Sequence, residues 1–436
     1  MCPHGWFNGI KHCGAVEDAH VLRGGNQLIL IDYSLVFLSA LLLLPAIVFA
    51  VECVAALFER PSPLYLTKAC PRFTIVVPAH NEGHTIGETV CHLLKQIDTH
   101  GKLVVVADNC SDETASEAKI AGANVWTRTD AQKKGKGYAI EFAVERLKDD
   151  PPEVVIIIDS DCRVSSGAIN LLSRAAATYR RPIQALYLMD PPAVSSVLTY
   201  VSTFAYLVRN LVRPVGLHKL GFPCHLTGTG MAFVWEQLLT IPPQRSNLVE
   251  DLSMGLEAAI NGYPPLLLKE AEVHSEFPES LIAAAAQRRR WEHGQLAAAS
   301  ALVPRLVIEG VRQRRVDILG LAADLIVPPL SLLVLIIGAA TLTSLMTYMI
   351  SGSPIALTIN LLALLLVGLT TIAIWVRFAR KVIPGRALVL APFYILWKLP
   401  SYAALLIGRR QKAWIRTERT SGKCRSKDNK NSDATP

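Results

Sequence analysis

Residues 154–161 read VVIIIDSD, five β-branched apolar residues followed by two aspartates with one serine between them. So short and so apolar a run is typical of a strand that is buried on both faces of a parallel sheet. In open α/β sheets, ligands bind at the carboxyl ends of such strands. Asp159 and Asp161 are therefore expected at a ligand site, where they suit a divalent cation that also holds phosphate oxygens. For the pair alone, an Asp that caps the next helix is an alternative interpretation.

The residues before this strand alternate between strand and helix patterns. Strands are predicted over residues 73–77, 103–107 and 124–128, and helices over residues 85–97, 115–122 and 138–148. Such alternation predicts right-handed βαβ units and a parallel sheet. The expected fold class is therefore α/β, with a Rossmann-like, mainly parallel sheet.

The chain of 436 residues is 51% hydrophobic, which is too apolar for a purely soluble enzyme. Residues 33–58 and 355–376 are long and apolar enough to cross a bilayer. Residues 318–350 are predicted to form one long helix whose first part lies at the membrane interface. Residues 388–407 contain Lys398 and two prolines, so we expect a re-entrant or interfacial segment there.

The distribution of Lys and Arg suggests an orientation, because basic loops stay in the cytosol. We expect an extracytoplasmic segment first, then a transmembrane helix, a cytosolic domain, a membrane region with two spans and a re-entrant or interfacial segment, and a basic cytosolic tail. Their predicted bounds are residues 1–31, 32–58, 59–300, 301–408 and 409–436.

The formal net charge is +8, but the tail alone carries nine Lys or Arg against three acids. The rest of the chain is close to balanced, which argues against nucleic-acid binding by the main domain. The tail suits an anionic membrane surface instead. The nine cysteines include no C-x-x-C pair, so we expect free thiols in a reducing compartment.

Four further motifs carry groups that could do chemistry, although each has a plainer interpretation. Asp108 ends a predicted strand and could bind a ribose or base, or could simply form a turn. Lys136 lies between two glycines, where it could neutralise a phosphate or remain a solvated loop lysine. Glu250-Asp251 could provide a general base or favourable charge at a helix N-terminus. Residues 287–291, QRRRW, could bind a phosphate and a sugar face, or could be basic residues beside a membrane.

In their order along the chain, these motifs resemble those of the membrane-embedded family 2 glycosyltransferases with a GT-A fold. That group includes cellulose, chitin and hyaluronan synthases and ceramide glucosyltransferases. The resemblance covers residues 73–291 and the flanking spans. It implies a GT-A-type sheet with flanking transmembrane and interfacial helices, and an inverting transfer from a nucleotide-diphosphate sugar, in the first place a UDP-sugar.

The resemblance also implies roles for individual residues. Asp251, next to Glu250, would be the general base, and Asp159 and Asp161 would hold Mg²⁺ or Mn²⁺. The residues implied in donor binding are Asp108, Lys136, Asp159, Gln287, Arg290 and Trp291. The residues implied on the acceptor side are Thr227, Gly228, Thr229 and Gly230, which read Thr-Gly-Thr-Gly where cellulose synthases have a Phe-Cys-Gly-type sequence.

The expected function is transfer to a polysaccharide or lipid-linked acceptor at the cytosolic face of the inner (plasma) membrane. The chain would be a multi-pass protein of cell-surface or exopolysaccharide synthesis, with partners in a synthesis or export complex. The alternatives are a glycolipid glycosyltransferase of the diacylglycerol or ceramide type and, in another class, an inactive membrane scaffold or transport component.

Overall fold

The computed structural model describes residues 11–60, 66, 69–191, 196–241, 250–277, 281–400 and 402. The predicted basic tail, residues 401 and 403–407 of the predicted re-entrant or interfacial segment, and residues 1–10 of the predicted extracytoplasmic segment lie outside these residues.

The described strands form one mixed sheet in the order β3-β2-β1-β4-β7-β6-β8-β5. Strands β3, β2, β1 and β4 run parallel, whereas β7 is antiparallel to both β4 and β6. The α/β class with a mixed, mainly parallel sheet is thus confirmed. The strands are β1 (Phe73–Ala79), β2 (Gly101–Asp108), β3 (Asn124–Arg128), β4 (Val154–Ile157), β5 (Arg163–Val164), β6 (Ile183–Asp190), β7 (Met231–Val234) and β8 (Leu266–Glu276).

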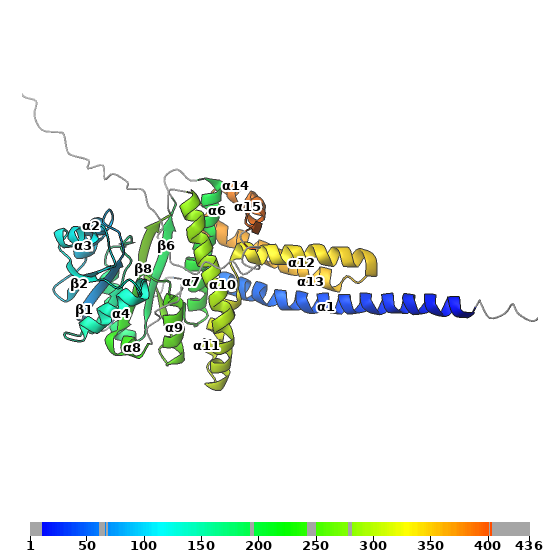
Figure 1. Ribbon diagram of the computed structural model, residues 1–436, viewed down its shortest axis with the longest axis horizontal. Helices are drawn as coiled ribbons and strands as arrows, with labels where there is room; N and C mark the ends of the chain where they lie inside the picture. Colours follow the sequence, from blue (N-terminus) through cyan, green and yellow to red (C-terminus); the bar gives the residue numbers. More distant parts are fainter. Residues whose placement is uncertain are drawn as a thin grey trace, which may run out of the picture.

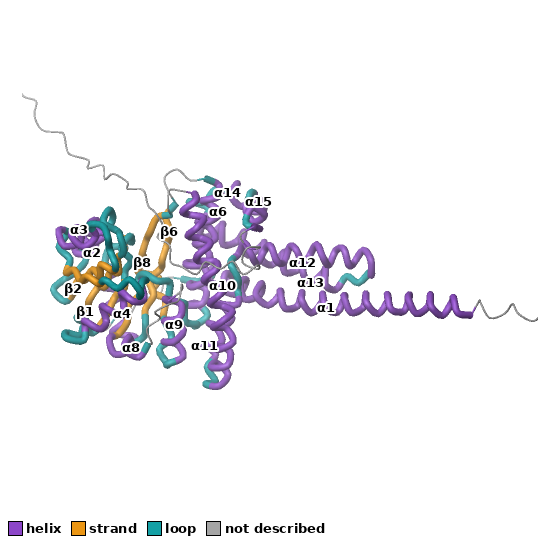
Figure 2. Tube along the Cα trace, viewed as in Figure 1, coloured by secondary structure: helices purple, strands orange, loops and turns teal. Residues whose placement is uncertain are grey.

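Helices cover both faces of the sheet, as Figure 2 shows. One face packs against α2 (Ile86–Leu94), α3 (Thr114–Ile120) and α5 (Ala168–Tyr179). The other packs against α4 (Lys136–Leu147), α8 (Trp235–Thr240) and α9 (Glu250–Ile260). Every residue of β4 is buried, which explains why this strand reads as one uninterrupted apolar run.

The remaining helices form the part of the molecule that lies away from β1 and β2. Helices α12 and α13 pack together and against α1, and the three project from the domain in Figure 1. The elements are α1 (Lys11–Leu57), α6 (Val197–Leu207), η1 (Val208–Val212), α7 (Arg213–Lys219), α10 (Leu281–Arg312), α11 (Val316–Ile326), α12 (Leu330–Ser351), α13 (Ile355–Ile374), η2 (Trp375–Ala379), α14 (Gly385–Val389) and α15 (Ala391–Trp397).

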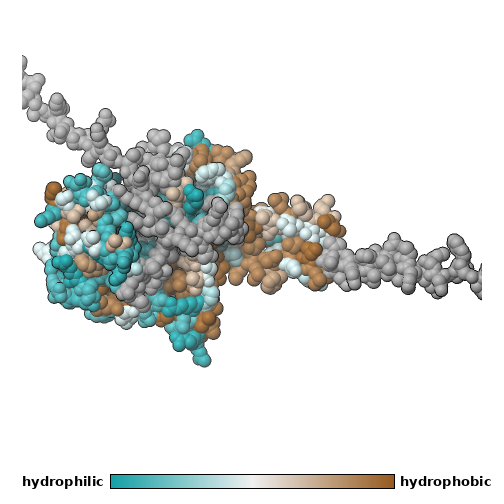
Figure 3. Space-filling view, viewed as in Figure 1, coloured by the Kyte–Doolittle hydropathy of each residue, from teal (hydrophilic) through white to brown (hydrophobic). Residues whose placement is uncertain are grey.

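Among the described residues, three helical segments have the length and composition to cross a membrane: Ile29–Leu57, Leu330–Ser351 and Ile355–Ala379. Hydrophobic residues gather over α12 and α13 in Figure 3, while hydrophilic ones prevail over the sheet domain. This division suggests that the chain associates with a membrane through these helices.

The prediction of one long helix over residues 318–350 is wrong. Helix α11 ends at Ile326 and α12 begins at Leu330. Pro328 and Pro329 lie between the two helices, and a proline inside a helix loses a hydrogen bond and clashes with the preceding turn. Helix α10, in turn, runs without interruption through residue 300, where we predicted the end of the soluble domain.

A buried ion network joins α1 to the helices of the domain. Arg213 in α7 donates a 2.7 Å hydrogen bond to Glu52 of α1 and a 2.5 Å bond to Asp324 of α11. His225 Nε2 lies 2.7 Å from the other oxygen of Asp324. A Cβ on Gly216 would lie 1.9 Å from the Glu52 carbonyl oxygen, so α7 and α1 meet at backbone contact.

Burial alone would raise the pKa of Asp324, but Arg213 and His225 outweigh it and hold that pKa below its ordinary value. The carboxylate therefore stays charged. A buried charge without its partner is costly. The structure therefore needs Arg213 at any pH at which Glu52 and Asp324 are ionised.

We predict that Arg213→Met destabilises the protein by about 3–5 kcal/mol, because it leaves two buried acids without their cation. The measurement is thermal unfolding of the detergent-purified chain. Arg180→Met is the matched control, since Arg180 is 61% exposed and pairs with Glu236 at 3.4 Å. An equal loss of Tm in both variants would contradict a structural role for the network.

Candidate active site

The carboxyl end of β4 carries the two predicted metal ligands. Asp159 and Asp161 follow the strand, and their carboxylate oxygens lie within 4.8 Å of each other and of the thiol of Cys162. The backbone N–H of Asp159 donates a 3.0 Å hydrogen bond to the hydroxyl of Thr229. Because Thr229 is fully buried, this bond fixes the loop after β4 against the loop before β7.

This donor set fits a hard divalent cation. Mg²⁺ and Mn²⁺ favour carboxylate oxygens and keep water or phosphate as further ligands. Burial raises the pKa of the Cys162 thiol well above its ordinary value, and only a thiolate is a good ligand. Asp159 and Asp161 are therefore the residues that could hold the ion, and Cys162 is their packing neighbour.

Lys136, the first residue of α4, ties two loops of the site together. Its ammonium donates a hydrogen bond to the carboxylate of Asp159 and another, 2.6 Å long, to the carbonyl oxygen of Gly228. Burial alone would lower the pKa of Lys136, but Asp159, Glu250 and Asp251 raise it well above its ordinary value. The lysine therefore stays charged among these acids.

The loop at residues 227–230 lies between Lys136 and Asp251. Gly228 has a φ of +93°, and a Cβ there would lie 3.1 Å from Asp251 Oδ2 and 3.5 Å from Lys136 Nζ. The backbone of the loop thus passes directly beside the predicted base.

Gln184, the second residue of β6, holds this loop in place. Its side-chain N–H donates a 2.8 Å hydrogen bond to the carbonyl oxygen of Thr229, and its Oε1 accepts one of 2.9 Å from the backbone N–H of Thr227. The sequence analysis did not identify Gln184. The signal was its place as a lone amide near the start of an apolar strand, where burial requires partners.

Glu250 and Asp251 begin α9 next to this loop. Asp251 Oδ1 accepts a 2.8 Å hydrogen bond from the backbone N–H of Leu252. Burial raises the pKa of Asp251, and burial together with the charge of Asp251 raises the pKa of Glu250 to about 7. Carboxylates shifted in this direction are stronger bases, which suits proton abstraction from a hydroxyl.

Helix α10 brings Arg290 and Trp291 to the same region. Burial lowers the pKa of Arg290 and the carboxylates of Glu250 and Asp159 oppose that effect, so the guanidinium lies in the field of the site's acids. The ring of Trp291 lies 5.5 Å from the ring of Tyr206, which is not among the predicted residues. On the same helix, Gln287 is buried, and its Oε1 has no hydrogen-bond partner within the described residues.

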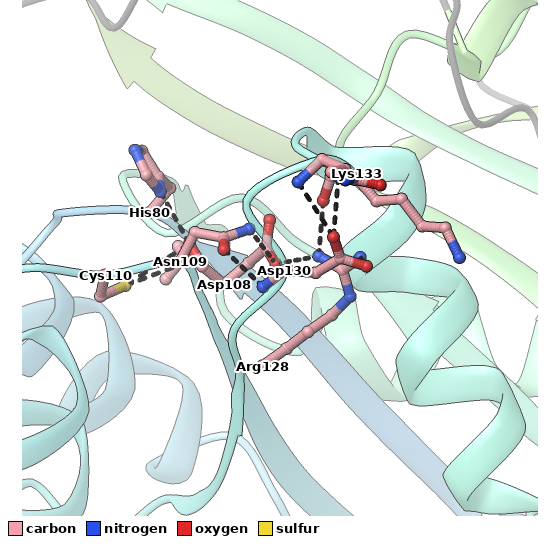
Figure 4. Close-up of polar contacts among 9 residues, drawn as sticks. His80, Asp108, Asn109, Cys110, Arg128, Asp130 and Lys133 are labelled. Carbon is pink, nitrogen blue, oxygen red and sulfur yellow. Dashed lines mark hydrogen bonds and ion pairs between the residues drawn. The ribbon is translucent and has the colours of Figure 1, made fainter.

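Asp108 belongs to a second cluster at the same edge of the sheet, drawn in Figure 4. Its carboxylate accepts hydrogen bonds of 2.5 Å from Arg128 and 3.0 Å from the side chain of Asn109. Arg128, which the sequence analysis missed, is the register partner of Asp108 on β3. Arg128 also donates a 2.8 Å bond to the carbonyl oxygen of Lys133, so this cluster anchors the loop that leads to Lys136.

The cluster around Asp108 and the cluster around Lys136 lie at the same edge of the sheet but are separate. Strand β1 lies between β2 and β4, so the ends of β2 and β4 are two strand spacings apart, roughly 10 Å. The structure groups most of the other predicted site residues near Lys136, whereas Gln287 and Trp291 lie along α10. The grouped residues are Asp159, Asp161, Thr227, Gly228, Thr229, Gly230, Glu250, Asp251 and Arg290.

The sequence model of the family described as "Glycosyltransferase like family 2" matches residues 71–294, slightly more than half of the chain. The chain belongs to this family. The predicted enzyme class is thereby confirmed: the protein is a family 2 glycosyltransferase. No curated protein matches the chain.

A solved structure with a similar fold is also a glycosyltransferase. The mannosyltransferase PcManGT from Pyrobaculum calidifontis, solved with GDP-Man and Mn²⁺, is 15% identical over 86% of this chain and 99% of its own, with a TM-score of 0.50. Glucosyl-3-phosphoglycerate synthase from Mycobacterium tuberculosis, solved with Mn²⁺, UDP and phosphoglyceric acid, is 21% identical over 48% of this chain and 74% of its own, with a TM-score of 0.32. The likeness to the mannosyltransferase shows that the fold of this glycosyltransferase is of the GT-A type.

We predict that Gly228→Ala lowers turnover at least tenfold, because the new methyl group would press on the Asp251 carboxylate and the Lys136 ammonium, and a misplaced catalytic group costs on the order of 10²-fold. The measurement is release of nucleoside diphosphate by membranes that contain equal amounts of each variant.

Gly262→Ala is the control for backbone strain. Gly262 has a φ of +94°, and nothing lies within 4 Å of a Cβ built there. Both variants should lose similar stability, since both place alanine in the left-handed region. Equal turnover of the two variants would show that the Gly228 loop does not border the catalytic groups.

Proposed function

We propose that this glycosyltransferase inverts the anomeric centre as it moves a sugar from a nucleotide-diphosphate donor to a hydroxyl of its acceptor. One observation carries the proposal: Lys136 bonds both to Asp159 and to the loop of Gly228, which borders Asp251. The site thereby combines a fixed cation, two carboxylates that suit a metal ion and one carboxylate that suits a base.

The nucleoside is proposed to bind at the Asp108 cluster and the diphosphate at the end of β4. The separation of the two clusters, roughly 10 Å, supports a ligand extended along this edge of the sheet. A UDP-sugar is the donor that we propose first. A GDP-sugar is the second, because the mannosyltransferase of similar fold binds GDP-Man.

Charge stabilisation at the leaving group falls to Lys136 and Arg290. Negative charge grows on the diphosphate as the bond from the sugar carbon to oxygen breaks, and cations already in place lower the barrier without reorganising. Gln287 and Trp291 would complete the donor site from α10. Mg²⁺ or Mn²⁺ on Asp159 and Asp161 would supply further stabilisation of that charge when bound.

Asp251 is proposed as the general base. A sugar or lipid hydroxyl is too weak an acid to ionise at neutral pH, so its proton must pass to a base as it attacks. The diphosphate leaves as an anion and needs no acid, so one carboxylate suffices for inversion. Glu250 places a second carboxylate beside Asp251. Gly228 borders the base, and Thr229 positions the Asp159 loop.

The acceptor is proposed to be a polysaccharide or a lipid-linked sugar at the cytosolic face of the inner (plasma) membrane. In this proposal residues 59–300 lie in the cytosol, residues 301–408 contribute two spans and residues 388–407 do not cross. A glycolipid of the diacylglycerol or ceramide type is the second acceptor class. An inactive scaffold is the less favoured alternative, because it would retain a costly cluster of buried acids without a use for it.

We predict that Asp251→Asn abolishes transfer while the affinity for the nucleoside diphosphate stays within about threefold of wild type, because the amide cannot take the proton. In wild type the pKa of Asp251 is raised, so the base becomes protonated at a higher pH than an ordinary carboxyl group, whose pKa is near 4. As the pH decreases, activity should therefore begin to fall before the pH reaches about 4. Transfer is measured with labelled nucleotide sugars and binding by calorimetry.

Asp317→Asn is the matched control, since Asp317 is also the second residue of a helix, α11, but is paired to Arg315 away from the site. Transfer by Asp251→Asn at the rate of this control would remove Asp251 from the role of base.

We predict that Asp161→Ala removes the Mn²⁺ dependence of UDP binding, because a single remaining carboxylate holds the ion weakly. The measurement is the UDP affinity with and without Mn²⁺. Asp149→Ala, which changes an exposed acid before β4, should keep the wild-type dependence. An unchanged Mn²⁺ effect in Asp161→Ala would move the metal site elsewhere.

A further inference from the structure

A cavity lies where the catalytic domain meets the membrane-type helices. We call it the membrane-side cavity, and it is lined from α1, α6, η1, α10, the Pro328-Pro329 turn, α12 and α15. In Figure 1, α6, α10 and α15 gather where α1 and α12 reach the domain. The predicted site residues do not account for this space, apart from Trp291 on its wall.

Part of the cavity wall lies close to the proposed catalytic groups. Trp291 and Tyr206 line it, with their rings 5.5 Å apart. Arg209, one turn before Arg213, also lines it. Burial lowers the pKa of Arg209, and Tyr206 and Asp251 oppose that effect, so its guanidinium lies in the field of the proposed base.

Helices of the membrane type form another part of the wall. Phe49 lies in the candidate span Ile29–Leu57, and Leu330 begins the candidate span Leu330–Ser351. A molecule in the cavity can therefore contact both the residues close to the proposed catalytic groups and the apolar surfaces of the membrane-type helices. An amphiphile requires such a site, with polar groups for its headgroup and an apolar surface for its hydrocarbon chain.

The charges on the wall are not all balanced. Arg213 is neutralised by Glu52 and Asp324, and Lys398 is paired to Glu292. These pairs explain three of the charged side chains on the wall, Arg213, Lys398 and Glu292, as structure.

Arg209 and Arg288 are different. The side chain of neither makes a hydrogen bond or ion pair with any other residue in the part of the chain that the structure describes, and both are only partly exposed. Two guanidinium groups beside an aromatic pair form a site for an anion, because guanidinium binds phosphate oxygens in a bidentate manner.

We propose that the membrane-side cavity binds the acceptor, and that the acceptor is a lipid whose headgroup carries both a phosphate and a free hydroxyl. The phosphate pairs with Arg209 and Arg288, the hydrocarbon chain lies against α1 and α12, and the hydroxyl reaches towards Asp251. This inference rests on the proposed function and names the substrate class of the same site.

The transfer step then balances. The acceptor oxygen forms a bond to the sugar carbon, the bond from that carbon to the donor diphosphate breaks, and the nucleoside diphosphate leaves with the electron pair. The hydroxyl proton passes to the Asp251 carboxylate. The lipid phosphate is not a reactant and only anchors the headgroup. Because the nucleophile is a hydroxyl, a base is still required.

Binding of short-chain phosphatidylglycerol tests the site, because this probe has both a phosphodiester and free hydroxyls. Calorimetry on the detergent-purified full chain compares it with dioctanoylglycerol, which has a hydroxyl and no phosphate, and with inorganic phosphate. We expect phosphatidylglycerol to bind at least about tenfold more tightly than either, since the arginines add charge-assisted contacts and the helices add apolar ones. Equal affinity for dioctanoylglycerol would overturn the phosphate contact, and equal affinity for inorganic phosphate would overturn the lipid assignment.

Arg209→Gln and Arg288→Gln should each weaken phosphatidylglycerol binding about tenfold, and Arg209→Lys should retain more of it. Arg289→Gln is the matched control, because Arg289 neighbours Arg288 on α10 but is exposed and does not line the cavity. A Tm close to wild type identifies variants that fold. If Arg209→Gln weakens UDP binding and leaves lipid binding unchanged, Arg209 belongs to the donor site and the proposal fails.

The same data separate this inference from the proposed function, since lipid binding is measured without turnover. Binding of phosphatidylglycerol with the expected arginine dependence, but no release of nucleoside diphosphate from any donor, would support the lipid site and sink the transfer reaction. Donor turnover with no selective lipid binding would do the reverse.

Discussion

The site depends on one buried ammonium. Lys136, at the start of α4, bonds to the carboxylate after β4 and to the backbone of the loop before β7. Asp159, Glu250 and Asp251 all act on its charge, and three acids gathered in a buried place would repel one another without it. The cation therefore allows segments from three parts of the sequence to meet at one edge of the sheet, and it leaves carboxylates there for chemistry.

The same device recurs where the domain meets the membrane-type helices. Arg213 neutralises acids of α1 and α11, and the contact at Gly216 brings α7 against α1. The hydrophobic cluster around these helices includes Phe49 of α1, Val212 of η1 and Ile337 of α12. The catalytic domain is thus attached by both packing and charge, and the membrane-side cavity lies within this attachment.

The sequence predicts the central strand well, because burial on both faces demands an uninterrupted apolar run. Carboxylates that follow such a strand are expected at the edge of the sheet where ligands bind. The sequence also reveals the motifs proposed to be catalytic because each is local. Arg128 meets Asp108 only once β3 pairs with β2 in one register, and Gln184 gains its role only when the loop at Thr229 passes behind it. Arg209 lies in an apolar run, where no local signal shows that Arg213 is paired whereas Arg209 has no side-chain partner among the described residues. The break between α11 and α12 does have a local signal in Pro328 and Pro329, since two consecutive prolines do not continue a helix.

The most direct test of the account is release of nucleoside diphosphate by the purified full chain, screened over UDP- and GDP-sugars with Mn²⁺ or Mg²⁺. The account predicts release from at least one donor, with dependence on the metal ion and loss on chelation. Release from no donor under either metal would contradict the central claim that these residues form a working glycosyl-transfer site.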